Sequence, residues 1–140
     1  QTVTVGTPFD PAEHEFAVKP GHATITGQAF MRRNDGVVVY AAGSQVMLLP
    51  ASSYVLEIYE ASQKIYGAAK VGNLDQRLAV YTKAVQANGE GRFSFSGVPD
   101  GSYLIATQVV WMAGDMRQGG DLTKFVTVAG GQNVDAILTR

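Results

Sequence analysis

The chain has 140 residues, with 11 lysines and arginines against 12 aspartates and glutamates, and it has no cysteine. This length is typical of one domain that folds without a disulfide or a metal, and the missing cysteine excludes disulfides, thiol catalysis and thiolate metal sites. No basic stretch is interleaved with aromatic residues, so nucleic acid is not a predicted partner, and no apolar run approaches the ~20 residues that a membrane-spanning helix needs.

The first 21 residues predict an N-terminal arm. A short alternation over residues 2–5 is followed by prolines at positions 8, 11 and 20, which interrupt regular structure. The arm is nevertheless too apolar to favour full disorder, and we expect it to dock on its own domain or on a neighbouring subunit by strand addition. Its apolar side chains are Val3, Val5, Phe9, Phe16 and Val18.

The segment after the arm predicts strands joined by tight turns. Alternating apolar residues indicate strands over 23–33, 36–41 and 45–49, and Asn34-Asp35-Gly36 is a turn signal between the first two. Pro50 ends this run.

A helix is expected near residues 53–66. Ser52 or Ser53 would cap its N-terminus, and Gly67 would end it. Its apolar face has helical spacing and consists of Tyr54, Ile58, Ala61 and Ile65. Residues 67–78 are expected to form a loop.

The second half again predicts strands, over 80–87, 92–96, 102–112, 123–129 and 133–139. Phe93 and Phe95 fall on one face, as do Tyr103 and Trp111, and residues 113–120 are expected to be a loop. The whole pattern predicts a mainly β protein, a Greek-key sandwich of about seven strands with one inserted helix near 53–66.

The segment from Asn88 to Tyr103 resembles the signature of carboxypeptidase regulatory-like domains: a turn, a glycine, a Phe-x-Phe strand and then Pro-x-Gly-x-Tyr. Residues 26–30, 41–50 and 126–132 are similar to other strands of these domains. The resemblance covers about residues 22–140, which are expected to form the domain beside the arm of residues 1–21, and it implies a transthyretin-like (prealbumin-like) sandwich.

The inserted helix makes the chain similar to a subgroup of small bacterial secreted proteins or lipoproteins. This resemblance implies an extracytoplasmic setting: the periplasm, an outer-membrane-attached position or the cell surface. Contact with a membrane is expected only through a lipid anchor upstream of Gln1. The resemblance implies no reaction.

The sequence contains no recognisable catalytic, cofactor or metal site, and we expect the protein not to be an enzyme. His14 and His22 are the only histidines, and the first lies among acidic residues without the His-Glu-x-x-His spacing of a metalloprotease. It is expected to belong to a polar, solvated arm. No Gly-x-Ser-x-Gly elbow occurs, and Gly89-Glu90-Gly91 precedes a strand rather than a helix, so we interpret it as a hairpin turn.

The predicted function is a non-enzymatic binding or scaffolding domain of the bacterial envelope. One alternative is a carbohydrate-binding module with an aromatic platform drawn from Tyr40, Tyr54, Tyr59, Tyr66, Tyr81 and Trp111. The other is a structural subunit that assembles through its arm. A protein partner, or a second copy of the chain, is expected at the arm and in the 113–120 loop, through Val3, Val5, Phe9, Phe16, Asp115, Met116 and Arg117.

Overall fold

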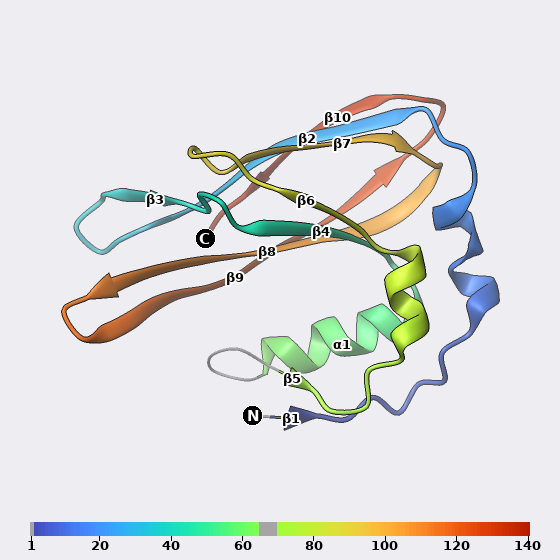
Figure 1. The fold of residues 1–140 in the computed structure, drawn as a ribbon, viewed down its shortest axis with the longest axis horizontal. Coiled ribbons are helices and arrows are strands. Elements are labelled where there is room, and N and C mark those ends of the chain that lie inside the picture. The colour runs from blue at the N-terminus through green and yellow to red at the C-terminus, as the bar shows by residue number, and fades with distance from the viewer. Residues whose placement is uncertain (1, 65–69) are drawn as a thin grey trace.

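The computed structural model describes residues 2–64 and 70–140 and is mainly β. Two four-stranded open sheets face each other (Figure 1). In the first sheet, the central strand β2 pairs in parallel with β10 and antiparallel with both β7 and β3. These strands are β2 (Ala23–Arg32), β3 (Val38–Tyr40), β7 (Arg92–Val98) and β10 (Asn133–Leu138).

The second sheet has the order β6-β4-β8-β9, and all its neighbouring strands are antiparallel. It consists of β4 (Gln45–Pro50), β6 (Lys83–Gln86), β8 (Gly101–Ala113) and β9 (Met116–Val128). The predicted β-sandwich is therefore confirmed at the level of its layers.

The main core lies between the two sheets and follows the alternation of the strands. Phe93 and Phe95 point inward from β7, and Tyr103 and Ile105 point inward from β8, as predicted. The Tyr103 hydroxyl donates a hydrogen bond to the carbonyl of Pro99 at 2.7 Å, and burial raises the pKa of this phenol to about 12. The hydroxyl therefore remains a donor inside the core at neutral pH.

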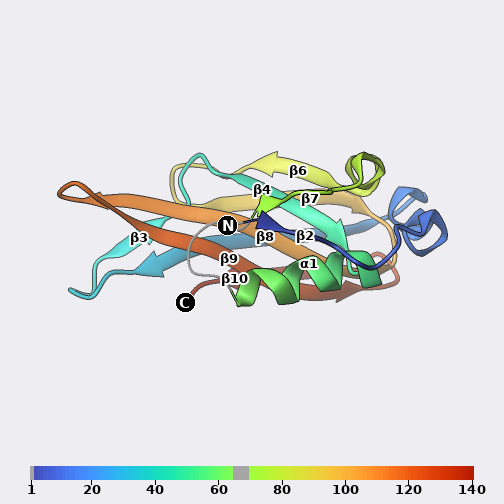
Figure 2. The ribbon, with the colours of Figure 1, turned by 90° about the horizontal axis from the view of Figure 1, so that it is seen from below.

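Helix α1 (Ser53–Gln63) covers part of the outer face of the second sheet (Figures 1 and 2). Ser52 is its N-cap and accepts a hydrogen bond from the amide of Val55 at 3.1 Å. A second, smaller apolar cluster lies beneath the helix and consists of Val5, Tyr54, Val55, Leu78 and Leu104. The predicted helix end at residue 66 and the stop at Gly67 lie outside the described residues.

The structure corrects three of the predicted segments. The expected loop over 113–120 is a continuation of the long β8–β9 hairpin, which turns at Gly114 with a φ of 64°. The expected strand over 80–87 begins only at Lys83, because the 3-10 helix η3 (Gln76–Tyr81) precedes it. The expected loop over 67–78 contains the short strand β5 (Lys70–Val71). The described residues thus form ten strands rather than about seven.

The arm docks on its own domain. Strand β1 (Thr2–Val3) pairs in parallel with β5, and the side-chain amide of Asn73 bonds to both backbone groups of Val5, at 2.8 and 2.9 Å. The 3-10 helices η1 (Pro11–Glu13) and η2 (Glu15–Val18) continue along the end of the sandwich. Glu13 then ties the arm to α1 by accepting bonds from the amide and the hydroxyl of Ser53.

His14 does not lie on a solvated surface, and that prediction is wrong. Its side chain is 0% exposed and stacks on the ring of Phe9 with ring centroids 4.2 Å apart. Its Nδ1 atom lies 2.7 Å from the carbonyl oxygen of Asp10, while its Nε2 atom has no partner within the described ranges. The packing of Phe9 and of Tyr81, which is distant in sequence, removes this histidine from water.

Glu57 of α1 fastens the start of the arm, and this contact predicts a pH dependence. Its carboxylate accepts hydrogen bonds from the Thr7 hydroxyl and from the amides of Gly6 and Thr7, both at 2.7 Å, and these bonds lower the pKa of the Glu57 carboxyl. Because the pKa is lowered on folding, the stabilisation is present above the usual glutamate value and is lost as the pH falls through the lowered value.

We therefore expect the amide NMR signals of Gly6 and Thr7 to stay fixed through the ordinary titration range of a glutamate and to shift only at lower pH. The Glu57→Gln variant should lack this titration. A midpoint at or above the usual glutamate value in the parent protein would show that the carboxylate does not hold the arm.

Candidate ligand-binding cleft

A cleft of about 570 Å³ lies between α1 and the outer face of the second sheet. Its floor is formed by β4, β8 and β9, and its walls are formed by α1 on one side and by Val3 and Val71 of the β1–β5 pair on the other. No helix within the described ranges is long and apolar enough to cross a membrane.

The floor of the cleft is apolar because of side chains that alternate with those of the core. Val46 and Leu48 of β4 point inward, so Met47 and Leu49 point outward, and Ala106 of β8 does the same. Such an outer face is normally polar where it meets water. Here α1 covers only part of it, and Met47 remains 37% exposed.

Tyr59 is the aromatic side chain of the cleft. It is half-buried in the wall that α1 provides, and the edge of its ring contacts Phe125 of β9, with centroids 5.0 Å apart and planes at 75°. This edge contact holds the ring beside the apolar floor. The cleft therefore contains one aromatic side chain that packs against the second sheet.

A polar pair lies at one end of the floor. Gln108 of β8 and Asp121 of β9 are directly opposite in the strand register, and the Gln108 side-chain amide donates to one carboxylate oxygen of Asp121 at 3.2 Å. The other carboxylate oxygen of Asp121 accepts no hydrogen bond within residues 2–64 and 70–140. It is an acceptor that a ligand can use.

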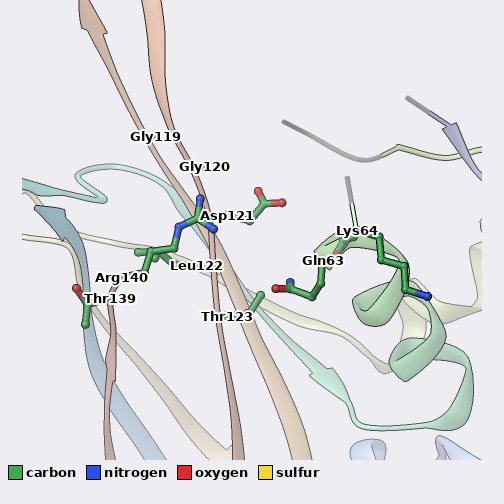
Figure 3. A pocket seen from close by; sticks show the side chains of 10 residues that line it. Gln63, Lys64, Gly119, Gly120, Asp121, Leu122, Thr123, Thr139 and Arg140 are labelled. Atoms are coloured by element: carbon green, nitrogen blue, oxygen red, sulfur yellow. The ribbon is translucent and has the colours of Figure 1, made fainter. Parts of the chain in front are cut away.

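A second cavity of about 760 Å³ adjoins the first, and the two share Ser62, Asp121 and Thr123. Figure 3 shows Gln63 at the end of α1 pointing toward Thr123 of β9, with Lys64 beside it pointing away, and Asp121 and Arg140 on the far side of the cavity. The two cavities together form one elongated cleft. Its half beside Met47 and Tyr59 is apolar, and its half beyond Asp121 is polar and carries charges of both signs.

The groups with shifted pKa values serve the fold rather than this cleft. The pKa of Asp75 is lowered to about 2, mainly by hydrogen bonds from the Arg77 side chain and backbone, and this pair caps η3. Hydrogen bonds likewise lower the pKa of Glu13 through Ser53 and that of Asp35 through the Val37 amide. No group of three or more His, Cys, Asp or Glu side chains suited to a metal occurs in the described part of the chain.

The predicted partner-binding residues do not come together. In the arm, Val5 is buried, Val3 lines the cleft, Phe9 stacks on His14, and Phe16 packs against Tyr103 with centroids 5.5 Å apart. The remaining three residues are exposed around the turn of the β8–β9 hairpin, far from η1 and η2 (Figure 1): Asp115, Met116 and Arg117. A partner at this hairpin remains a prediction.

The six aromatic residues considered for a platform are also dispersed. Tyr54 is buried, Tyr81 packs beside His14, and Tyr40 is exposed next to Phe30. Tyr66 lies outside the described residues. Of the others, Tyr59 lines the cleft and Trp111 lies on the opposite face of the second sheet.

Sequence reasoning missed Met47, Gln108 and Asp121. Alternation alone places Met47 on the outer face of β4. It does not predict that α1 leaves part of the outer face of the second sheet open to a ligand. The Gln108–Asp121 pair depends on the register of β8 against β9, which requires knowing that the hairpin turns at residues 114–115.

Comparison with known proteins finds a similar solved structure. No family model and no curated protein sequence matches the chain. Among solved structures, the chain is similar to PA1324 from Pseudomonas aeruginosa, described as a "putative carbohydrate binding protein", with a TM-score of 0.82 and 29% identity. The similarity covers 96% of this chain and 99% of PA1324, so it extends over the arm, the sandwich and α1 together.

Proposed function

We propose that this protein is a non-catalytic carbohydrate-binding domain and that its ligand lies in the elongated cleft beside α1. The observation that carries this proposal is the position of Tyr59 and the apolar floor next to the Gln108–Asp121 pair. A sugar ring has an apolar C–H face and a rim of hydroxyls. The C–H face packs well on an aromatic ring. The hydroxyl rim needs side-chain donors and acceptors in fixed positions.

The similarity to PA1324 supports the same ligand class. The cleft is open without rearrangement: the Tyr59 ring packs against Phe125, and the Asp121 carboxylate accepts a hydrogen bond from Gln108. A preformed site of this kind loses little conformational freedom when it binds.

We also propose that the sandwich is a carboxypeptidase regulatory-like domain of the transthyretin-like type and that it works outside the cytoplasm, in the bacterial envelope. The support is the Asn88–Tyr103 signature, which lies on β7, the following turn and the start of β8. Fractionation of the native cells tests the location: recovery with the periplasm, outer membrane or medium supports it, and recovery with the cytosol contradicts it.

Replacing Tyr59 with alanine is expected to weaken saccharide binding by about tenfold or more, because the ring is the aromatic anchor of the cleft. The measurement is titration calorimetry with cellotetraose, maltotetraose, chitotetraose and an acidic tetrauronate, using the saccharide that the parent protein binds most tightly. Tyr40→Ala is the matched control, since Tyr40 is exposed and lies outside the cleft. Equal losses in both variants, or no loss in Tyr59→Ala, would place the ligand elsewhere.

A further inference from the structure

Two hairpins extend past the rest of the sandwich at the same end: β2–β3 and the far part of β8–β9 (Figures 1 and 2). Between them lies a cleft of about 430 Å³, which we call the sandwich mouth. It is lined by Met31 to Asp35 from the first hairpin and by Trp111, Ala113, Gln118 and Gly119 from the second.

Trp111 is the only tryptophan of the chain and forms the apolar part of the mouth. It follows the buried Val109 on the inner face of β8, and its ring packs against the edge of the main core. The side chain remains half-exposed because the core ends at this layer. Gln118 of β9 is its direct partner in the strand register and lines the same cleft.

The β2–β3 turn contributes exposed, paired polar groups to the mouth. Arg33 donates to one carboxylate oxygen of Asp35 at 2.5 Å, and the other oxygen of Asp35 accepts from the amide of Val37 at 3.1 Å. Gly36, with a φ of 85°, closes this turn. The guanidinium and the carboxylate are therefore oriented toward each other, and Asn34 adds an amide beside them.

We propose that the sandwich mouth is a second saccharide-binding site. It combines an indole face with amide, guanidinium and carboxylate groups, which is the chemistry that a polyhydroxylated ring requires. Because side chains alternate along a strand, Trp111 lies on the inner face of the second sheet while Gln108 and Asp121 lie on its outer face. One domain would then hold two saccharide units on opposite faces of the second sheet. This inference takes only its ligand class, a saccharide, from the function proposed above.

The fluorescence of Trp111 reports on this site directly, since no other tryptophan contributes. We expect the saccharide chosen by calorimetry to change this fluorescence in a saturable way and to bind with a stoichiometry of two. The fluorescence change should persist in Tyr59→Ala. It should require about tenfold more saccharide in Gln118→Ala, a substitution at an exposed side chain that leaves the core intact.

The outcomes separate the two proposals. Binding with a stoichiometry of one and no change in Trp111 fluorescence would overturn the second site and leave the cleft beside α1 in place. A fluorescence change that disappears in Tyr59→Ala would also overturn it, because a single site would then explain the data. The absence of binding by any saccharide would overturn both proposals. A Trp111→Phe variant with unchanged stoichiometry and affinity at both sites would show that the indole takes no part.

Discussion

Replacing Phe95 with alanine is expected to lower the free energy of unfolding by about 3–5 kcal/mol. Phe95 is 2% exposed, pairs with Ile25 in the register of β7 against β2, and contacts the edge of Phe93 with centroids 5.9 Å apart. It lies in the middle of the main core, so truncation leaves a cavity between two packed sheets. The neighbouring backbone cannot close this cavity without breaking strand pairing.

Urea unfolding followed by far-UV circular dichroism measures this effect. Phe125→Ala provides the matched control, because Phe125 lies on the outer face of β9 and is 42% exposed. We expect the control to cost about 1 kcal/mol or less. A nearly neutral Phe95→Ala would mean that the register of β7, and with it the core, is wrong.

The second large effect is expected at Gly91, in the turn before β7. Gly91 has a φ of 73°, and a Cβ atom at this position would lie 2.3 Å from the carbonyl oxygen of Ala29. That neighbour is backbone of β2, whose Ala29 amide donates to the Gly91 carbonyl at 2.9 Å. Gly91→Ala therefore combines an unfavourable backbone conformation with a clash, and the expected loss of stability is about 2–5 kcal/mol.

Gly89 in the same turn is the control for this prediction. No atom lies within 4 Å of a Cβ built at Gly89, so Gly89→Ala is expected to change the midpoint of thermal unfolding little. If both variants unfold at the temperature of the parent protein, the turn does not have the close approach to β2 that the structure shows.

Period-2 alternation predicted the strands, because each buries one face against the core. Phe93, Phe95 and Tyr103 were placed correctly by this signal, and Ser52 was recognised as one of two candidate caps. In the β8–β9 hairpin, β8 was predicted, but the first part of β9, over 116–122, was missed. Its glycines and polar side chains are typical of a loop, and it is held as a strand by backbone pairing beyond the sandwich rather than by burial.

The candidate site was harder to predict than the fold. His14 is preceded and followed by acidic residues, yet Phe9 and Tyr81 bury it, and Tyr81 is distant in sequence. The cleft beside α1 likewise depends on how far the helix covers the sheet and on the pairing that brings Gln108 to Asp121. Spacing along one segment cannot report such contacts between elements.

The most direct test of the central claim is to map a bound saccharide onto the backbone by NMR. Amide shifts are followed as the tightest saccharide of the four is added to the Trp111→Phe protein, which isolates the cleft beside α1 from the sandwich mouth. The proposed function predicts that the largest shifts fall around Tyr59 on α1, Met47 on β4, and Gln108 and Asp121 on β8 and β9. Shifts confined to η1, η2 or the sheet edge at β10, with none around Tyr59 and Asp121, would contradict it.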